Sequence, residues 1–512
     1  MLTDACVLNK RVDAVVHPNM VHEHFRLLYQ INTRVWLTEL SRTLGHCATL
    51  DDIPDVALDQ FAEQGFGWIW LLSIWQTGPV AQAISRAHPG WRREFEETLH
   101  DLHDDDIAGS GFAIQSYNVH RNLGADEALA RLRQRMKKRG LKLMVDFVPN
   151  HMAPDHPWTD EHPDYFVHGG ETDLARSSRN YGRVSTRNGP VLLAYGRDPY
   201  FEGWPDTIQL NYSNPALQTA MVGELLRISD QCDGLRCDMA MLVLPEVFER
   251  TWGIQSEPFW LKAIEAVRRE HPDFVFLAEV YWDMEGAMHQ QGFDFAYDKR
   301  LYDRLRVQHA RPVREHLSAG LQYQNKLARF LENHDEPRAA ATFSREVHEA
   351  AAILTYLWPG LRFFHQGQFE GNPKRISPHL VRGPIDNVDD SLKHFYERLL
   401  AILRNHGTLE ETWGPIDCVP AWEGNGTHDN FIACTWQGMD GQRMLVVVNY
   451  SAQQSQCYVR LPFDGLGNNT WHLKDAMSNA VYDRDGTDLV SRGLYMDVPK
   501  WHYHVFYMER HL

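Results

Sequence analysis

The sequence predicts an α/β protein: a (β/α)8 TIM barrel with an inserted subdomain after its third strand and a C-terminal all-β sandwich domain. Short apolar runs alternate with amphipathic helical segments over most of the chain, and eight such runs occur. Runs that are apolar on both faces are typical of parallel strands covered by helices, and eight strand–helix units favour a closed barrel over an open sheet. We expect an N-terminal extension at 1–29, the barrel at 30–410, the inserted subdomain at 151–205 and the sandwich at 411–512.

Each expected barrel strand is a short apolar run, and several of the runs end in polar or charged residues. In chain order they are TRVWL at 33, GWIWLLSIW at 67, LKLMVDFVPN at 141, GLRCDMAM at 234, FVFLAEVYW at 274, FDFAYD at 293, LARFLENHD at 327 and LRFFHQGQ at 361. The segments between them have helical periodicity. In ADEALARLRQRMKKRG, for example, Leu129, Leu132 and Met136 fall on one face and Gly140 marks the end.

Three segments break this alternation. Residues 151–205 are rich in His, Pro, Gly, Asp and Arg without a clear period, which indicates a long insertion. Residues 76–108 form a long connection that contains HDLHDDD at 100; a solvated acidic loop is favoured over a cation site there because no calcium-loop spacing is present. After about residue 410, runs such as FIACTW and RMLVVVNYS are separated by turns, which predicts a small all-β domain.

Composition narrows the partners. The formal net charge of −17 argues against nucleic acid or an anionic membrane surface as the main partner, because both favour basic patches. The seven cysteines are scattered without a CxxC pair, so neither a disulfide framework nor a zinc cluster is expected. No signal peptide and no run of about 18 apolar residues is evident. These features predict a cytoplasmic protein and leave the oligomeric state open.

Ionisable residues gather at the carboxyl ends of four expected strands. They are Asp146 and His151 on the third, Arg236 and Asp238 on the fourth, Glu279 on the fifth, and His334 and Asp335 on the seventh. Any one of them alone would more simply be a surface charge or a structural ion pair. Because the carboxyl ends of all barrel strands meet on one face, we expect them to form one site.

Several carboxylates without a cysteine metal set indicate acid/base and nucleophilic chemistry on a glycosidic bond. Arg236 and Asp238 are two residues apart on one strand, so they face the same side and the arginine can hold Asp238 ionised as a nucleophile. Glu279 follows three apolar residues and lies near other carboxylates, a setting that raises the pKa of a carboxyl toward that of a general acid.

The motifs DFVPNH, GLRCD, FLAEV and ENHDE resemble, in order, the four signature regions of the α-amylase family of glycoside hydrolases and transglycosylases, and IQLNYSNP at 208 and PGLRFFHQGQ at 359 also match. The resemblance implies that Asp238 is the nucleophile, Glu279 the acid/base and Asp335 a third carboxylate that binds sugar hydroxyls. It implies a retaining mechanism with a covalent glycosyl-enzyme intermediate.

The same resemblance implies substrate-binding residues. Arg236, His151 and His334 would bind the sugar at the cleaved bond, with Asp146 supporting them. Phe112, in GSGFAIQSY at 109, corresponds to the aromatic residue that stacks on that sugar, although an ordinary core phenylalanine is an almost equally good interpretation.

The sequence departs from the family pattern after Asp238. Many members have a Lys-His pair where this chain has Met241 and Leu242; that pair lines leaving-group subsites, and its histidine helps to bind a structural calcium ion. Asn150, a calcium ligand in many members, is kept. The resemblance therefore implies no required cofactor or metal, leaves a structural calcium open, and argues against binding of long polymers in the usual way.

The leading hypothesis is a retaining glycoside hydrolase that cleaves α-glucosidic bonds in α-glucan oligosaccharides or small α-glucosides. A transglycosylase, isomerase or phosphorylase with the same intermediate is the second hypothesis within enzymes. A non-catalytic carbohydrate-binding protein is disfavoured because Asp238, Glu279 and Asp335 are all present. The length of the 76–108 segment further suggests that it walls the pocket and favours short oligosaccharides.

Overall fold

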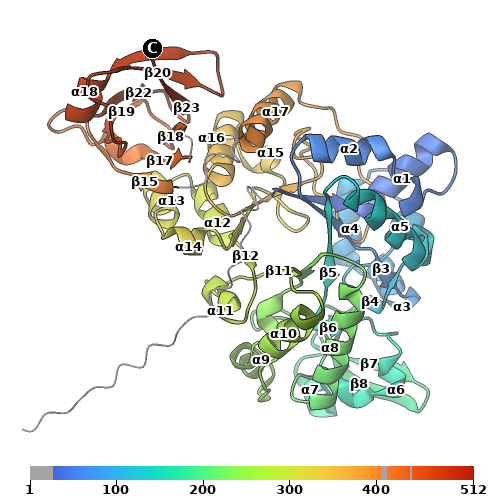
Figure 1. Cartoon of the computed structure of the whole chain (residues 1–512). Coiled ribbons are helices and arrows are strands. Elements are labelled where there is room, and N and C mark those ends of the chain that lie inside the picture. Colours follow the sequence, from blue (N-terminus) through green and yellow to red (C-terminus); the bar gives the residue numbers. More distant parts are fainter. Residues whose placement is uncertain (1–26, 406–411, 439–440, 512) are drawn as a thin grey trace, which may run out of the picture.

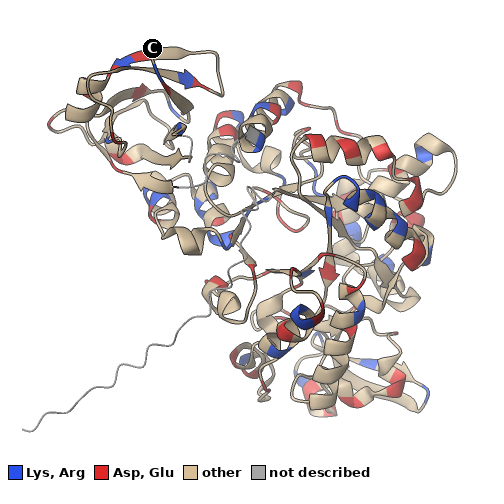
Figure 2. Ribbon diagram, viewed as in Figure 1, with Lys and Arg blue, Asp and Glu red and all other residues tan. Residues whose placement is uncertain are grey.

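The computed structural model describes residues 27–405, 412–438 and 441–511 of the chain. A barrel surrounded by helices occupies the first of these ranges, and an all-β domain, red in Figure 1, follows it. Acidic and basic residues are interspersed along the outer helices (Figure 2). Within the described residues, no helix is both long and apolar enough to cross a membrane.

Eight parallel strands close into a barrel, which confirms the predicted fold class. Neighbouring strands follow chain order, and β1 closes the barrel by pairing with both β2 and β14. The strands are β1 (Leu27–Asn32), β2 (Trp68–Leu72), β5 (Lys142–Phe147), β10 (Gly234–Cys237), β11 (Val275–Ala278), β12 (Phe295–Tyr297), β13 (Leu327–Arg329) and β14 (Leu361–His365). The register of β5 and β10 places Arg236 beside Asp146, so two predicted site residues are neighbours across strands.

The prediction of the first strand was wrong. TRVWL lies in helix α1 (Thr33–Leu44), and the strand is the preceding segment LLYQIN. The side chain of Asn32 caps this helix by accepting a hydrogen bond from the backbone N–H of Val35. Within the described residues the first barrel strand therefore starts at Leu27, three residues before the expected start of the barrel at residue 30. The rest of the predicted N-terminal extension lies outside the described residues.

Helices cover the outside of the barrel. The helices between successive barrel strands include α1, α2 (Asp55–Glu63), α5 (Ala125–Lys137), α8 (Pro215–Ser229), α9 (Pro245–Trp252), α10 (Trp260–Glu270), α11 (Glu285–Gln290), α12 (Lys299–Val307), α13 (Ala310–Leu317), α14 (Leu321–Gln324), α15 (Ala339–Thr342) and α16 (Arg345–Tyr356), and α17 (Asp390–Asn405) follows the last strand. In α5, Leu129, Leu132 and Met136 are buried, as the apolar spacing predicts.

Two long connections leave the carboxyl ends of β2 and β5. The first contains β3 (Trp75–Thr77), α3 (Pro79–Ala87), α4 (Pro89–Thr98) and β4 (Ile114–Val119). The second follows β5 and contains β6 (His151–Met152), α6 (Trp158–Glu161), α7 (Glu171–Arg176), β7 (Tyr181–Thr186), β8 (Gly189–Ala194) and β9 (Ile208–Gln209). Antiparallel pairing of β6 with β9 joins the start and end of this insertion and sets His151 opposite Gln209.

The C-terminal domain is a β-sandwich, as predicted, with its own apolar core between two sheets. One sheet has the order β15-β17-β18-β23-β20-β21 and the other β16-β19-β22. The elements are β15 (Thr412–Ile416), β16 (Cys418–Pro420), β17 (Phe431–Gln437), β18 (Arg443–Asn449), β19 (Ser455–Val459), β20 (Thr470–Asp475), β21 (Val481–Asp485), α18 (Gly486–Ser491), β22 (Leu494–Val498) and β23 (Tyr503–Arg510). The predicted boundary at residues 410–411 lies outside the described residues.

The sandwich packs against the barrel helices. The indole N–H of Trp436 in β17 donates to the backbone carbonyl of Leu357 at the end of α16 (3.0 Å). The hydroxyl of Tyr450 donates to the carbonyl of Leu305 in α12 (2.8 Å). Apolar side chains of both domains also belong to one continuous core.

Candidate active site

The buried guanidinium of Arg236 organises the carboxyl face of the barrel. Its side chain is 0 % exposed; Nη1 lies 2.6 Å from Oδ1 of Asp238 and 3.5 Å from Oδ1 of Asp146, while Nη2 lies 2.7 Å from Oε2 of Glu279. The acids that end β10 and β11 therefore reach the two terminal nitrogens of one side chain. The structure thus brings four of the predicted site residues into one cluster.

Aromatic rings surround this guanidinium. Its central carbon lies 5.3 Å from the ring centre of Trp70, 5.2 Å from that of Phe112 and 5.9 Å from that of Tyr297. Phe112 is half-buried and stacks on His334 with 5.3 Å between ring centres. Phe112 therefore lines the predicted site, and its role as a platform for a sugar ring stays a prediction.

Besides its ion pair with Arg236, Glu279 makes two hydrogen-bonding contacts within the described residues. The backbone N–H of Met239 donates to Oε2 (2.7 Å), and the hydroxyl of Tyr281 lies 2.8 Å from Oε1. Burial raises the pKa of Glu279 to about 8; Arg236 opposes this, and the nearby charges of Asp238 and Asp335 add to it. At neutral pH this carboxyl is therefore protonated and can donate a proton.

The contacts of Tyr281 and of the Met239 N–H with Glu279 were not predicted from the sequence. A period-two signal could have found Tyr281, because it stands two residues after Glu279 in FLAEVYW. Met239 adopts a left-handed backbone conformation (φ +40°), which is unfavourable for a residue with a side chain. That conformation has no sequence signature here, since glycine or asparagine is usual at such a position.

His334 and Asp335 lie in the loop that follows β13. The amide Nε2 of Gln30 donates to Nδ1 of His334 (2.9 Å), so the ring proton is on Nε2, which lies 3.0 Å from Oδ2 of Asp335. Burial lowers the pKa of His334 well below its usual value, so the ring is neutral. The side chain of Asp335 is 43 % exposed, against 9 % for Asp238 and 3 % for Glu279. Asp335 is therefore the carboxylate nearest the opening of the site.

Asp146 supports the cluster from β5. Its Oδ2 accepts a hydrogen bond from the backbone N–H of Ser73 (3.3 Å), and its carbonyl accepts one from the indole of Trp75 (2.6 Å). Burial raises the pKa of Asp146 to about 7, with Arg236 opposing and Asp238 adding to the shift. These contacts tie the segment after β2, including β3, to β5 beside Arg236.

His151 begins the insertion and faces the same cluster. Its Nδ1 lies 3.3 Å from Nδ2 of Asn150, and its ring is 5.3 Å from that of Trp204. Burial lowers the pKa of His151 to about 4, and the charge of Asp238 partly offsets this. A Cβ at Gly196 would lie 2.8 Å from the Cβ of His151, so glycine is needed for the insertion to approach this ring.

The acidic HDLHDDD segment pairs with arginines. Arg382 binds Asp106 (2.6 Å) and Asp101 (3.0 Å), and Arg92 binds Asp104 (2.8 Å). Asp106 is nearly buried by this contact, whereas Asp101 and Asp104 remain exposed, as expected for a solvated loop. In the described parts of the chain, no group of three or more His, Cys, Asp or Glu side chains is arranged to hold a metal ion.

The residues around Asn150 do not fit a calcium ion. Nε2 of Gln209 lies 2.9 Å from the carbonyl oxygen of Asn150, 3.0 Å from its Oδ1 and 3.1 Å from the carbonyl oxygen of Leu210. An amide nitrogen thus fills the space between three neutral oxygens, whereas calcium takes six to eight oxygen ligands that usually include carboxylates.

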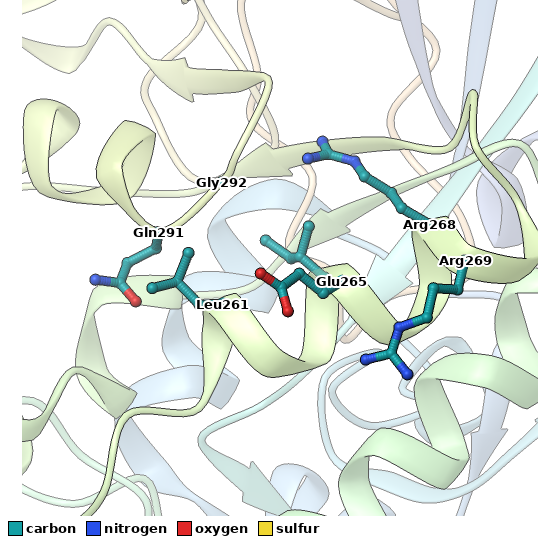
Figure 3. A pocket seen from close by; sticks show the side chains of 7 residues that line it. Leu261, Glu265, Arg268, Arg269, Gln291 and Gly292 are labelled. Carbon is teal, nitrogen blue, oxygen red and sulfur yellow. The ribbon is translucent and has the colours of Figure 1, made fainter. Parts of the chain in front are cut away.

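A separate hollow of about 470 Å³ lies outside the barrel (Figure 3). It is formed by α10 and the loop after α11 and is lined by Leu261, Glu265, Arg268, Arg269 and Gln291, among others. This loop leads into the amino end of β12, so the hollow opens on the side opposite the carboxylate cluster. It contributes no residue to the candidate active site.

Comparison with known proteins identifies the family. The family model "Alpha amylase, catalytic domain" matches residues 58–379, which is more than half of the chain. The chain belongs to the alpha-amylase family. This match covers most of the barrel and all of the carboxylate cluster described above, and it confirms the family resemblance that the four motifs predicted.

Similar proteins of the alpha-amylase family include hydrolases and glycosyl-transferring enzymes by name. The chain is 23 % identical over 399 residues to alpha-amylase MalA of Haloarcula japonica, covering 76 % of this chain and 51 % of MalA. It is 27 % identical over 273 residues to trehalose synthase/amylase TreS of Mycolicibacterium smegmatis, covering 46 % and 44 % of the two chains. The chain therefore spans about half the length of these relatives.

A solved structure shows the same fold. The maltogenic alpha-amylase AmyB of Thermotoga neapolitana superposes with a TM-score of 0.66 at 18 % sequence identity, over 94 % of this chain and 98 % of AmyB. The likeness thus extends through the insertion and the C-terminal sandwich.

Proposed function

We propose that the protein is a retaining glycoside hydrolase that cleaves α-glucosidic bonds in short α-glucan oligosaccharides or small α-glucosides through a covalent glycosyl-enzyme intermediate. One observation carries the proposal: a single buried guanidinium contacts both Asp238 and Glu279. The two carboxyls can therefore face the same sugar bond, as a retaining mechanism requires.

The contacts support different roles for the two carboxyls. Protonated Glu279 donates its proton to the glycosidic oxygen while Asp238 attacks the anomeric carbon, which forms a glycosyl ester and releases the leaving sugar. Arg236 and the Met239 N–H then stabilise the Glu279 carboxylate. Glu279 next takes a proton from water, the water oxygen attacks the anomeric carbon and Asp238 leaves. Two inversions give net retention.

The proposal of short substrates rests on contacts beside His334 between the 76–108 segment and the loop after β14. Arg375, in the loop after β14, donates to the carbonyl of His334 (3.3 Å) and pairs with Glu94 of α4. Backbone hydrogen bonds join the same two segments, including Ala108 N–H to His379 carbonyl (2.8 Å). These contacts support the hypothesis that the 76–108 segment walls the site. Such a wall would favour substrates that end near the cleaved bond.

Removing the Glu94–Arg375 pair should widen substrate choice. In Glu94→Ala the arginine loses its anchor on α4, and we expect the ratio of kcat/KM for maltoheptaose to that for maltose to rise about fivefold, the equivalent of about 1 kcal/mol for a partly exposed ion pair. Glu96→Ala is the matched control, since Glu96 on the same helix pairs with Arg92. An unchanged ratio in Glu94→Ala would argue against the wall as a selector of chain length.

The ionisation of Glu279 predicts an alkaline limit to activity. Because its pKa is raised to about 8, kcat/KM should fall about tenfold per pH unit above that value as the proton donor is lost. The folded state also holds a proton that the unfolded state lacks between pH 4.5 and about 8, so the stability contribution of this group declines across that window. A pH–rate profile and urea titrations at several pH values measure both effects.

The leaving group provides the control for this pH dependence. Aryl glucosides whose phenol is a good leaving group need little protonation, so their alkaline limb should be much shallower than that of a maltooligosaccharide. A maltooligosaccharide profile that stays flat through pH 10 would contradict the assignment of Glu279 as the acid.

The proposed function is tested by product analysis. The protein is incubated with maltooligosaccharides, sucrose and trehalose in water enriched in oxygen-18, and the products are followed by NMR and mass spectrometry. Hydrolysis with retention gives α-configured product carrying the label at the anomeric oxygen. A β-configured first product would exclude the covalent mechanism.

Transfer to a sugar acceptor or to phosphate is the second candidate function. The similarity to TreS, and to an alpha-1,4-glucan:maltose-1-phosphate maltosyltransferase of Burkholderia pseudomallei, supports this candidate. The same experiment distinguishes transfer from hydrolysis, because transfer or isomerisation yields α-configured products without the oxygen-18 label.

A further inference from the structure

We propose that Gln209 is a positioning residue of the active site: its side-chain amide orients Asn150, and Asn150 in turn fixes which ring nitrogen of His151 carries the proton. The inference deepens the proposed function, because His151 lies in the proposed sugar site. Its central test, the position of a ring proton, does not depend on catalytic activity.

Gln209 is held at the junction of the barrel and the insertion. It ends β9, is 0 % exposed, and pairs through the backbone with His151 of β6. Its Nε2 faces two oxygens of Asn150 (2.9 and 3.0 Å) and the carbonyl oxygen of Leu210 (3.1 Å). An amide nitrogen can only donate, so this cage of oxygens selects the NH2 end of the Gln209 amide.

The orientation of Asn150 follows from that contact. With Oδ1 accepting from Gln209, the Nδ2 group of Asn150 must point the other way, where it lies 3.3 Å from Nδ1 of His151. Because Nδ2 donates, Nδ1 of the ring accepts, and the ring proton is placed on Nε2. His151 then offers an N–H donor to a hydroxyl of the bound sugar.

Gln209→Glu has nearly the same shape but no donor. Its carboxylate would accept from Nδ2 of a reversed Asn150, which would turn Oδ1 toward His151 and move the ring proton to Nδ1. We expect two-bond proton–nitrogen correlation spectra of histidine-labelled protein to show this change at His151, assigned with His151→Gln. We also expect KM for the substrate to rise about tenfold with a smaller change in kcat.

The oxygen cage gives an independent readout. Calcium chloride should raise the melting temperature of Gln209→Glu, because the ion would turn Oδ1 of Asn150 back into the cage, where it joins the new carboxylate and the two carbonyl oxygens. Calcium should leave the melting temperatures of the wild type and of Gln209→Met unchanged. Gln218→Glu is the matched control. Its amide also donates to two carbonyls, those of Tyr212 and Glu257, but the residue lies on α8, so this variant should keep the His151 tautomer and KM.

Two results would overturn the proposal. One is an Nε2–H tautomer at His151 that persists in Gln209→Glu, which would make the residue a packing element only. The other is a wild-type melting temperature that rises with calcium and falls with a chelator, which would mean that the Gln209 amide points its oxygen into the cage and binds a cation there.

Discussion

Asp238→Asn is expected to lower kcat by about 10⁴-fold or more while the protein stays folded. The amide keeps the size of the carboxyl and its contact to Nη1 of Arg236, but it has no anionic oxygen to form the ester with the anomeric carbon. Steady-state kinetics on a maltooligosaccharide measure the loss. Asp230→Asn, which changes an exposed aspartate paired with His271, is the control and should retain full activity.

Azide distinguishes this assignment from the reverse one. In Asp238→Ala a small anion can take the place of the missing carboxylate and attack the anomeric carbon from the same face, giving a β-glycosyl azide from an α-linked substrate. In Glu279→Ala the glycosyl ester still forms with a good leaving group, and azide then attacks the opposite face to give an α-glycosyl azide. If the two variants yielded the opposite anomers, the roles of the carboxyls would be exchanged.

Arg236→Met should produce the largest loss of stability. The substitution keeps much of the volume but leaves Asp146, Asp238 and Glu279 without the buried cation that contacts all three. Leaving buried charges unpaired costs about 3–5 kcal/mol in the free energy of unfolding. Urea titration above pH 8 measures this cost, because Glu279 is ionised there as well. Activity should fall with it, because the same side chain holds the proton donor.

The pH dependence of this loss has a definite sign. Arg236 lowers the pKa of both Asp146 and Glu279, so in the variant these two carboxyls should take up protons at higher pH in the folded state. The stability deficit relative to the wild type should therefore shrink as the pH falls. Arg131→Met removes an exposed pair with Asp51 and should cost less than about 1 kcal/mol at any pH. An Arg236→Met protein as stable as the wild type at every pH would show that no carboxylate charge in the folded state depends on this arginine.

The barrel strands were largely predictable because burial on both faces leaves a continuous apolar run. The exception, TRVWL, shows the limit of that signal: its β-branched and aromatic residues suit a strand, yet Asn32 supplies a helix cap directly before it. Whether this segment forms a strand or a helix depends on its packing against the neighbouring strands. A short stretch of sequence does not contain that information.

Some residues of the candidate site could likewise be predicted from the sequence, and others could not. Asp238, Glu279 and Asp335 could be found because strand ends and short motifs mark them. Gln30 and Gln209 could not, since each contacts a site residue far away in the sequence and neither belongs to a charged cluster. The arginine partner of Asp106 likewise lies in the loop after β14, with no local trace in HDLHDDD.

The contacts of Trp436 and Tyr450 make the C-terminal sheets a buttress for the helices behind the later barrel strands. A domain that can be removed or exchanged would contact the barrel through a small polar interface. Here the apolar core continues from one domain into the other. Substitutions at the shared core of either domain are therefore constrained by the other domain. The two domains should be kept together when the protein is engineered.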